Sequence, residues 1–74
     1  MQDSKTNYYH IINTNIRNLR KKLKLSQEKF AETIGCSREY ISRLENNKEQ
    51  ISLSLIFRIS ETYNIKPEKF FTNV

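Results

Sequence analysis

The sequence predicts an all-α fold, a compact domain of five short helices. Apolar residues recur at helical spacing through most of the chain, and no stretch alternates apolar and polar residues as a half-buried strand would. Serine residues precede several of the apolar stripes, at the position where a helix N-cap belongs. With 74 residues the chain has room for one such domain. We expect residues 1–10 to be a flexible N-terminal segment and residues 11–74 to form the domain.

The first two predicted helices lead to a sharp turn. The first helix ends near Lys24, and its apolar stripe consists of Ile12, Ile16, Leu19 and Leu23. Its other face is basic and carries Arg17, Arg20, Lys21 and Lys22. The second helix begins after Ser26 and ends at Gly35. Glycine adopts the left-handed conformation most easily, so Gly35 suits a reversal between two packed helices.

The remaining three predicted helices also begin at recognisable residues. Ser37 caps the third, which turns Ile41 and Leu44 inward and ends at Asn46 and Asn47. Ser52 caps the fourth. One side of the fourth helix carries Leu53, Ile56, Phe57, Ser60 and Tyr63, and Leu55 and Ile59 extend the apolar surface. Pro67 opens a short fifth helix that brings Phe70 and Phe71 to the core or to a partner.

The net charge of +5 is unevenly distributed. Residues 1–48 contain ten Lys/Arg and five Asp/Glu, whereas three of each kind follow position 48. This asymmetry is expected if one face meets a polyanion and another face does not. A solubilising surplus of charge explains it equally well.

The chain lacks the patterns that catalysis requires. It has no paired carboxylates, no nucleophile with a base and no glycine loop for phosphates, so we expect no enzymatic activity and no cofactor. His10 has no partners at metal-ligand spacing, and Cys36 is expected to be a buried structural thiol. No apolar run reaches the ~18 residues of a membrane span, and the start does not resemble an export signal. We therefore expect a cytoplasmic protein with no membrane contact and no evident small-molecule ligand.

Residues 26–45, SQEKFAETIGCSREYISRLE, have the parts of a helix-turn-helix, whose second helix enters the major groove of DNA. The chain resembles the phage-repressor type of regulator, the Xre family, over residues 12–72. The matching positions are Ser26, Gln27, Ala31, Gly35, Ser37, Ile41, Ser42, Leu44, Glu45, Leu53, Ile56, Ile59 and Phe70. The run REYISRLE, the stretch ISL and the closing Phe70-Phe71 are most similar to controller proteins of restriction-modification systems. The resemblance implies a lambda-repressor-like DNA-binding domain and a transcription regulator. The chain departs from the family pattern at Asn47 and Ile51, in the loop between the third and fourth predicted helices.

The resemblance also implies which side chains meet DNA. Arginine can bond guanine O6 and N7, and glutamate can accept from cytosine N4, which favours base contacts for Arg38 and Glu39. The full set of predicted base contacts is Arg38, Glu39, Ser42 and Arg43. The predicted phosphate contacts are Gln27, Ser37, Tyr40, Arg20, Lys22, Asn46 and Lys48. For Tyr40, packing within the domain is an equally good interpretation. Arg20 is expected to pair with Glu45, as is common in this family.

One recognition helix reads few base pairs, so we expect a homodimer on a palindromic double-stranded DNA operator. The candidate dimer contacts lie in the neutral C-terminal third and are Leu55, Ile59, Phe71 and Val74. A phage-type repressor or an antitoxin-type autoregulator shares most of this frame. An RNA or protein adaptor is the alternative from a different class, but the outward face of the third helix offers charge rather than stacking aromatics.

Overall fold

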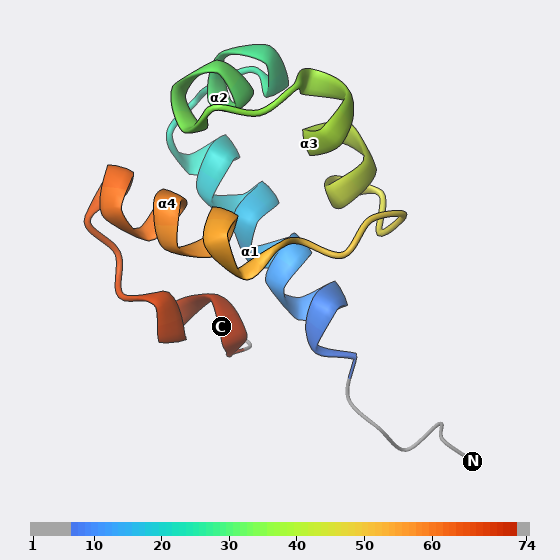
Figure 1. Ribbon diagram of the computed structural model, residues 1–74, viewed down its shortest axis with the longest axis vertical. Helices are drawn as coiled ribbons and strands as arrows, with labels where there is room; N and C mark the ends of the chain where they lie inside the picture. The colour runs from blue at the N-terminus through green and yellow to red at the C-terminus, as the bar shows by residue number, and fades with distance from the viewer. Residues whose placement is uncertain (1–6, 73–74) are drawn as a thin grey trace.

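A computed structural model describes residues 7–72 of the chain. The elements in order are α1 (Tyr8–Lys22), α2 (Gln27–Ile34), α3 (Arg38–Glu45), α4 (Leu53–Tyr63) and the 3₁₀ helix η2 (Pro67–Phe71). In Figure 1, α2 and α3 lie together at one end, α1 and α4 cross the middle, and η2 lies at the opposite end. Residues 7–72 contain no strand, which confirms the all-α prediction. The fifth predicted helix is a 3₁₀ helix, so the domain has four α-helices and one 3₁₀ helix within residues 7–72.

The predicted caps define the helix-turn-helix. The hydroxyl oxygens of Ser26, Ser37 and Ser52 each accept a hydrogen bond from an amide three residues later, at 3.0, 3.0 and 3.2 Å. Gly35 ends α2 in the left-handed conformation, with φ of +77°, as expected. Asn47 also has a positive φ, +61°, which asparagine tolerates better than most residues. The chain therefore reverses at the two places that the sequence indicates.

The first helix begins earlier than predicted. Asn7 is its N-cap, because the Asn7 side-chain oxygen accepts a bond of 3.2 Å from the His10 amide. The expectation that the flexible segment extends to residue 10 is wrong for residues 8–10, which are helical. Residues 1–6 lie outside the described part of the chain. The predicted domain boundary is too late because it follows the apolar stripe, which starts at Ile11 and Ile12, one turn after the cap.

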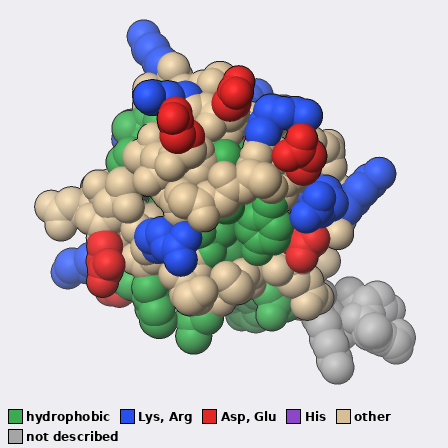
Figure 2. All heavy atoms as spheres, turned by 45° about the horizontal axis from the view of Figure 1, so that its top comes forward, with side chains coloured by type: hydrophobic (Ala, Val, Ile, Leu, Met, Phe, Trp, Pro, Cys, Tyr) green, Lys and Arg blue, Asp and Glu red, His purple; other side chains and the backbone are tan. Residues whose placement is uncertain are grey.

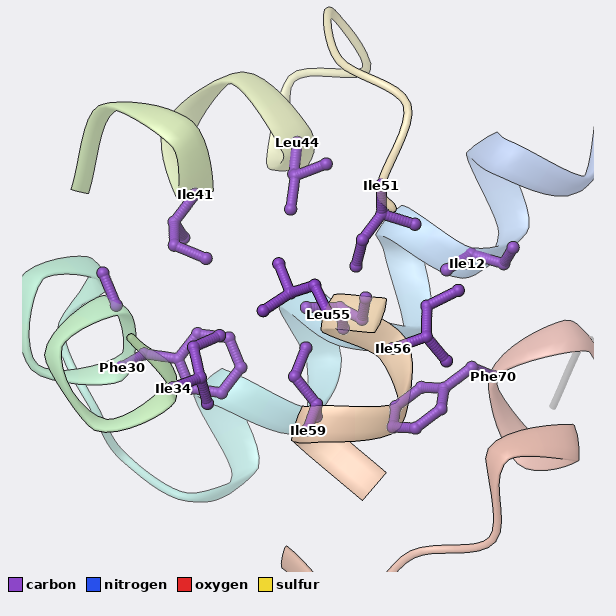
Figure 3. Packing of buried hydrophobic residues seen from close by; sticks show 12 residues of the cluster. Ile12, Phe30, Ile34, Ile41, Leu44, Ile51, Leu55, Ile56, Ile59 and Phe70 are labelled. Carbon is purple, nitrogen blue, oxygen red and sulfur yellow. The ribbon is translucent and has the colours of Figure 1, made fainter. Parts of the chain in front are cut away.

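The core draws on every helix. The most completely buried large side chains are Phe30, Ile16, Ile34, Ile41, Leu44 and Ile59, and Figure 3 shows side chains of α2, α3, α4, α1 and η2 pointing toward one another. Phe70 of η2 is 3% exposed and closes the far side of this core, which is the first of the two positions predicted for it. Two polar side chains are buried with it, namely Asn13, 2% exposed, and Ser60, 6% exposed.

The orientation of α4 differs from the predicted one. Leu55 and Ile59 are 4% and 0% exposed, whereas Leu53 and Phe57 are 59% and 46% exposed. Leu55 and Ile59 therefore belong to the core of one chain and cannot contact a second copy, so their assignment as dimer contacts is wrong. Phe71 is partly buried against the core, and Val74 lies outside the described residues.

No helix among residues 7–72 combines the length and the apolar character needed to span a bilayer.

Candidate nucleic-acid interface

Helix α3 has one fully buried face and one exposed face. Ile41 and Leu44 point into the core and have no accessible surface. Arg38 and Arg43 lie on the other side, and their side chains are 51% and 50% exposed. The apolar face therefore fixes the rotation of the helix, and the two arginines are presented outward.

The N-terminal end of α3 carries an exposed ion pair. A terminal nitrogen of Arg38 lies 3.7 Å from a carboxylate oxygen of Glu39, and both side chains are more than half exposed. Such a pair contributes about 0–1 kcal/mol in water, so either partner can leave it for a ligand. The hydroxyl of Ser37 serves first as the cap of the helix. Contacts of all three residues with DNA stay predictions.

Glu45 is the centre of a buried hydrogen-bond network that joins three helices. One carboxylate oxygen accepts from Arg20 Nε at 2.6 Å, and the other accepts from Arg20 Nη2 and Gln27 Nε2, both at 3.0 Å. The side chains of Arg20 and Glu45 are only 12% and 5% exposed. The predicted pairing of these residues is confirmed, and it ties α1 and the start of α2 to the end of α3.

This network also sets the ionisation of Glu45. Burial alone raises the pKa of this carboxyl, but the bonds from Arg20 and Gln27 and the charges of Arg20 and Arg17 outweigh burial. The pKa of Glu45 is therefore below its ordinary value, and the group is ionised at neutral pH.

Arg20 is a brace rather than a surface cation. Besides its two bonds to Glu45, its Nη1 donates to the Leu25 carbonyl oxygen at 2.7 Å, so each of its three nitrogens is engaged. Two of its five N–H donors remain, so its contact with a phosphate stays a prediction. Gln27 supports the same carboxylate, while its amide oxygen at the start of α2 accepts no hydrogen bond from residues 7–72.

The basic residues of α1 divide between two sides of the helix. Arg17 lies on the side of Arg20, one turn earlier, and its charge acts on Glu45. Lys22 lies on the other side, beside Lys69 and Phe70. The contact of Lys22 with a phosphate stays a prediction. Arg17 is exposed on the side of α1 that faces the Glu45 network, and its helical spacing from Arg20 is the signal by which the sequence could have identified it.

The second half of α3 is supported by its own neighbours. Tyr40 packs against the core while its ring lies 5.8 Å from the guanidinium carbon of Arg43. This position agrees with the packing interpretation of Tyr40. The side-chain nitrogen of Asn46 donates to the Ser42 carbonyl oxygen at 2.8 Å, and Ser42 is half-buried. Lys48 is exposed in the following loop.

Helix α4 supports the turn between α2 and α3. A terminal nitrogen of Arg58 donates to the carbonyl oxygens of Ile34 and Gly35 at 2.9 and 3.3 Å. These carbonyls end α2 and have no partner within the helix. The sequence analysis missed this role because Arg58 is 24 residues from Ile34.

Cys36 follows the same turn and packs against the core. Burial raises the pKa of the Cys36 thiol, and the charge of Arg58 only partly opposes this effect. A protonated thiol in this position is consistent with a structural role.

The surface at the α2–α3 end is of mixed charge. Figure 2 brings this end forward and shows basic and acidic side chains interspersed over it, with apolar side chains gathered mainly elsewhere. Because the charges are mixed, binding of a polyanion at this end depends on individual arginines and lysines that are not engaged in bonds within the protein.

Comparisons with known proteins identify the family. The helix-turn-helix family model matches residues 16–70. The control protein C.MunI of a Mycoplasma species is 38% identical over 60 residues, which cover 80% of this chain and 81% of that protein. The crystal structure of the restriction-modification controller protein C.AhdI from Aeromonas hydrophila has a TM-score of 0.76 at 28% identity, covering 85% of this chain and 91% of that one.

Other relatives are longer than this chain. The antitoxin PezA of Streptococcus pneumoniae is 40% identical over 55 residues, which cover 74% of this chain but 35% of PezA. A propionyl-CoA carboxylase regulator of Cereibacter sphaeroides is 33% identical over 58 residues, covering 78% of this chain and 13% of the regulator. The region common to all these proteins contains α2, the turn and α3. The chain therefore belongs to the helix-turn-helix family, as a DNA-binding transcription regulator of the Xre type.

Proposed function

We propose that this protein is a controller of a restriction-modification system that binds a palindromic operator as a homodimer, with α3 in the major groove. The two-faced α3 carries the proposal: its apolar side is fully buried, and Arg38 and Arg43 extend from the other side. The similarity to C.MunI and C.AhdI over most of their lengths supports the controller class.

The contacts divide into those that read sequence and those that position the protein. Base edges are read by Arg38, Glu39, Ser42 and Arg43. Phosphates are bound by Arg17, Arg20 and Lys22 of α1, Gln27 at the start of α2, Ser37 and Tyr40 of the recognition segment, and Asn46 and Lys48 after α3. A phosphate at Gln27 also gains from the N-terminus of α2.

The dimer surface lies away from α3. Four large apolar side chains are exposed on α1 and α4, namely Tyr8, Tyr9, Leu53 and Phe57. Tyr8, Tyr9 and Leu53 line an apolar groove together with Phe71, where the starts of α1 and α4 meet the end of η2. An apolar surface of this kind on a small domain favours contact with a second copy. The two α3 helices then face the same side of the duplex.

Two experiments test these proposals. Selection of bound sites from random duplexes, followed by footprinting, should yield a palindrome whose half-sites are about 34 Å apart, one helical turn. Sedimentation over a micromolar range should show a dimer that Leu53→Lys and Phe57→Lys dissociate, whereas Glu68→Lys, a change to lysine at an exposed position of η2 that does not line the groove, should not. A wild type that stays monomeric and occupies one half-site without cooperativity refutes the dimer.

The similarity to PezA favours one further candidate, an antitoxin-type autoregulator. The genes next to the selected operator distinguish the two. A site before genes of a restriction enzyme and its methyltransferase supports the controller proposal, and a site before a toxin gene supports the alternative. A protein that binds RNA but not duplex DNA would refute both the controller proposal and the antitoxin alternative.

A further inference from the structure

Arg43 is held in place by a residue outside α3. Its Nε donates to a carboxylate oxygen of Glu49 at 3.1 Å, and its guanidinium lies near the ring of Tyr40. Glu49 belongs to the loop between α3 and α4. This loop folds back on the helix, because the amide of Lys48 donates to the Arg43 carbonyl oxygen at 2.8 Å.

The loop that carries Glu49 is itself anchored to the core. The side-chain nitrogen of Asn13 on α1 donates to the Glu49 carbonyl oxygen at 3.2 Å and to the Asn47 side-chain oxygen at 3.3 Å. Asn13 is only 2% exposed, so this anchor is a buried polar contact rather than a surface one. A buried donor is kept in place by the cost of leaving it without a partner. The backbone of Glu49 therefore has a fixed position relative to the core.

This arrangement leaves the reading end of Arg43 free. Glu49 occupies only Nε, and the two terminal nitrogens of the guanidinium have no recorded partner in the described chain. Those two nitrogens form the fork that bonds guanine O6 and N7 or a phosphate. An arginine that is already held loses less side-chain freedom when it binds.

We propose that Glu49 is a specificity-determining positioning residue, which holds Arg43 so that its terminal nitrogens face the DNA bases. The inference rests on the proposed function of α3 and adds to it a residue that does not itself contact a base. Glu49 has a second effect of the same sign. Its negative charge lies close to the duplex and disfavours sequence-independent binding to phosphates. Both effects raise the ratio of operator affinity to random-duplex affinity.

The test is a double-mutant cycle read out as that ratio. Glu49→Ala should lower the ratio about two- to tenfold, the range expected for one side chain that loses its preorganisation. Glu49→Gln keeps an acceptor for Nε but loses the charge, so it should lower the ratio less than Glu49→Ala does. In an Arg43→Ala background, Glu49→Ala should change the ratio less than in the wild type. Glu68→Ala is the control, since it removes the same charge from an exposed position on η2, away from α3 and from the apolar groove.

Two results would contradict the proposed role of Glu49. If Glu49→Ala strengthens binding to operator and random duplex by the same factor, Glu49 is only a repulsive charge. If its effect on the ratio is the same with and without Arg43, it does not act through Arg43. The side chain of Glu49 is partly exposed, and its bond to Asn13 uses the backbone carbonyl, so its variants should fold, which circular dichroism checks.

A measurement without DNA separates this proposal from the proposed function. In the free wild type, the NMR signal of the Arg43 Nε proton should exchange slowly with water, and Glu49→Ala should abolish that protection. If the Arg43 Nε proton of the wild type exchanges rapidly, the proposed role of Glu49 in holding Arg43 is refuted, even if an operator is found. Protection together with no preference for any duplex refutes the proposed function, and the role of Glu49 in specificity with it.

Discussion

Replacement of Arg20 by methionine is the sharpest test of how the helix-turn-helix is held together. Methionine keeps the apolar stem of the side chain and removes the guanidinium. Three hydrogen bonds of 2.6, 2.7 and 3.0 Å disappear, and the Glu45 carboxylate, 5% exposed, retains only the bond from Gln27. The variant thus leaves a nearly buried charge with a fraction of its former support.

The expected loss can be estimated from these contacts. Removal of one partner of a buried ion pair typically costs about 3–5 kcal/mol. Gln27 and the charge of Arg17 remain, so we expect about 3 kcal/mol, the lower end of that range. Urea unfolding followed by circular dichroism measures it: with a slope of about 1 kcal/mol per molar, the midpoint should fall by about 3 M.

Lys29→Met is the matched control. Lys29 lies 3.5 Å from Glu32 in an exposed pair on α2, so its loss should change the free energy of unfolding by less than about 0.5 kcal/mol. Equal losses for Arg20→Met and Lys29→Met would refute the view that burial makes the Arg20–Glu45 pair important. Additive losses in a cycle of Arg20→Met and Glu45→Gln would mean that the two side chains do not interact.

The same variant predicts a change in pH dependence. Because the pKa of Glu45 is lower in the folded chain than in the unfolded one, its contribution to stability is present above the unfolded value of about 4.3 and is lost as the pH falls through the folded value. Without Arg20, burial raises that pKa, and the contribution disappears or reverses. The difference in unfolding free energy between wild type and Arg20→Met should therefore shrink in acid. A difference that stays constant from neutral pH to below the folded pKa would contradict this reasoning.

Four further substitutions test the proposed roles one by one. Arg38→Ala should weaken operator binding by about 1–3 kcal/mol and leave random-duplex binding nearly unchanged, and equal losses in a fluorescence titration would make Arg38 a phosphate contact. Arg17→Ala and Lys22→Ala should each reduce the slope of log affinity against log salt by about 0.9, and an unchanged slope would leave that residue without a phosphate contact. Arg58→Met should lower the free energy of unfolding by about 1–3 kcal/mol, because two carbonyls lose a charged donor; unchanged hydrogen exchange at the turn would mean that Arg58 does not support it.

The local signals in the sequence predicted the helices and turns well. Capping serines and a left-handed glycine act within a few residues, so their effect is visible in the chain itself. Ser26, Ser37, Ser52 and Gly35 all have the predicted roles. The predicted start of the first helix is too late, because the apolar stripe that indicates it begins after the cap at Asn7.

The spacing of apolar residues in α4 does not by itself indicate which face of this helix is buried. Apolar residues at positions 53, 55, 56, 57 and 59 provide two overlapping stripes, and a helix of this length can bury only one side in a small core. Which side it buries depends on α2 and η2, which are distant in sequence. The structure buries Leu55 and Ile59 and leaves Leu53 and Phe57 outside.

The site was predictable where the family resemblance supplied long-range information. The Arg20–Glu45 pair spans 25 residues and has no local period, so the resemblance alone suggested it. The contacts of Asn13 and Arg58 span 36 and 24 residues, and no pattern in the chain indicates them. Residues that position a recognition helix from other elements are thus the part that sequence reasoning misses.

Helix α4 connects the two surfaces on which the proposed function depends. Leu53 and Phe57 are exposed on it, and Arg58, the next residue, donates to the last carbonyls of α2 at the turn before α3. A dimer formed through the exposed side of α4 therefore holds each turn, and with it each α3, through one rigid helix. The distance between the two recognition helices is then fixed by packing rather than by a flexible linker. Rigid spacing of this kind lets a small domain distinguish operators by the separation of their half-sites as well as by their bases.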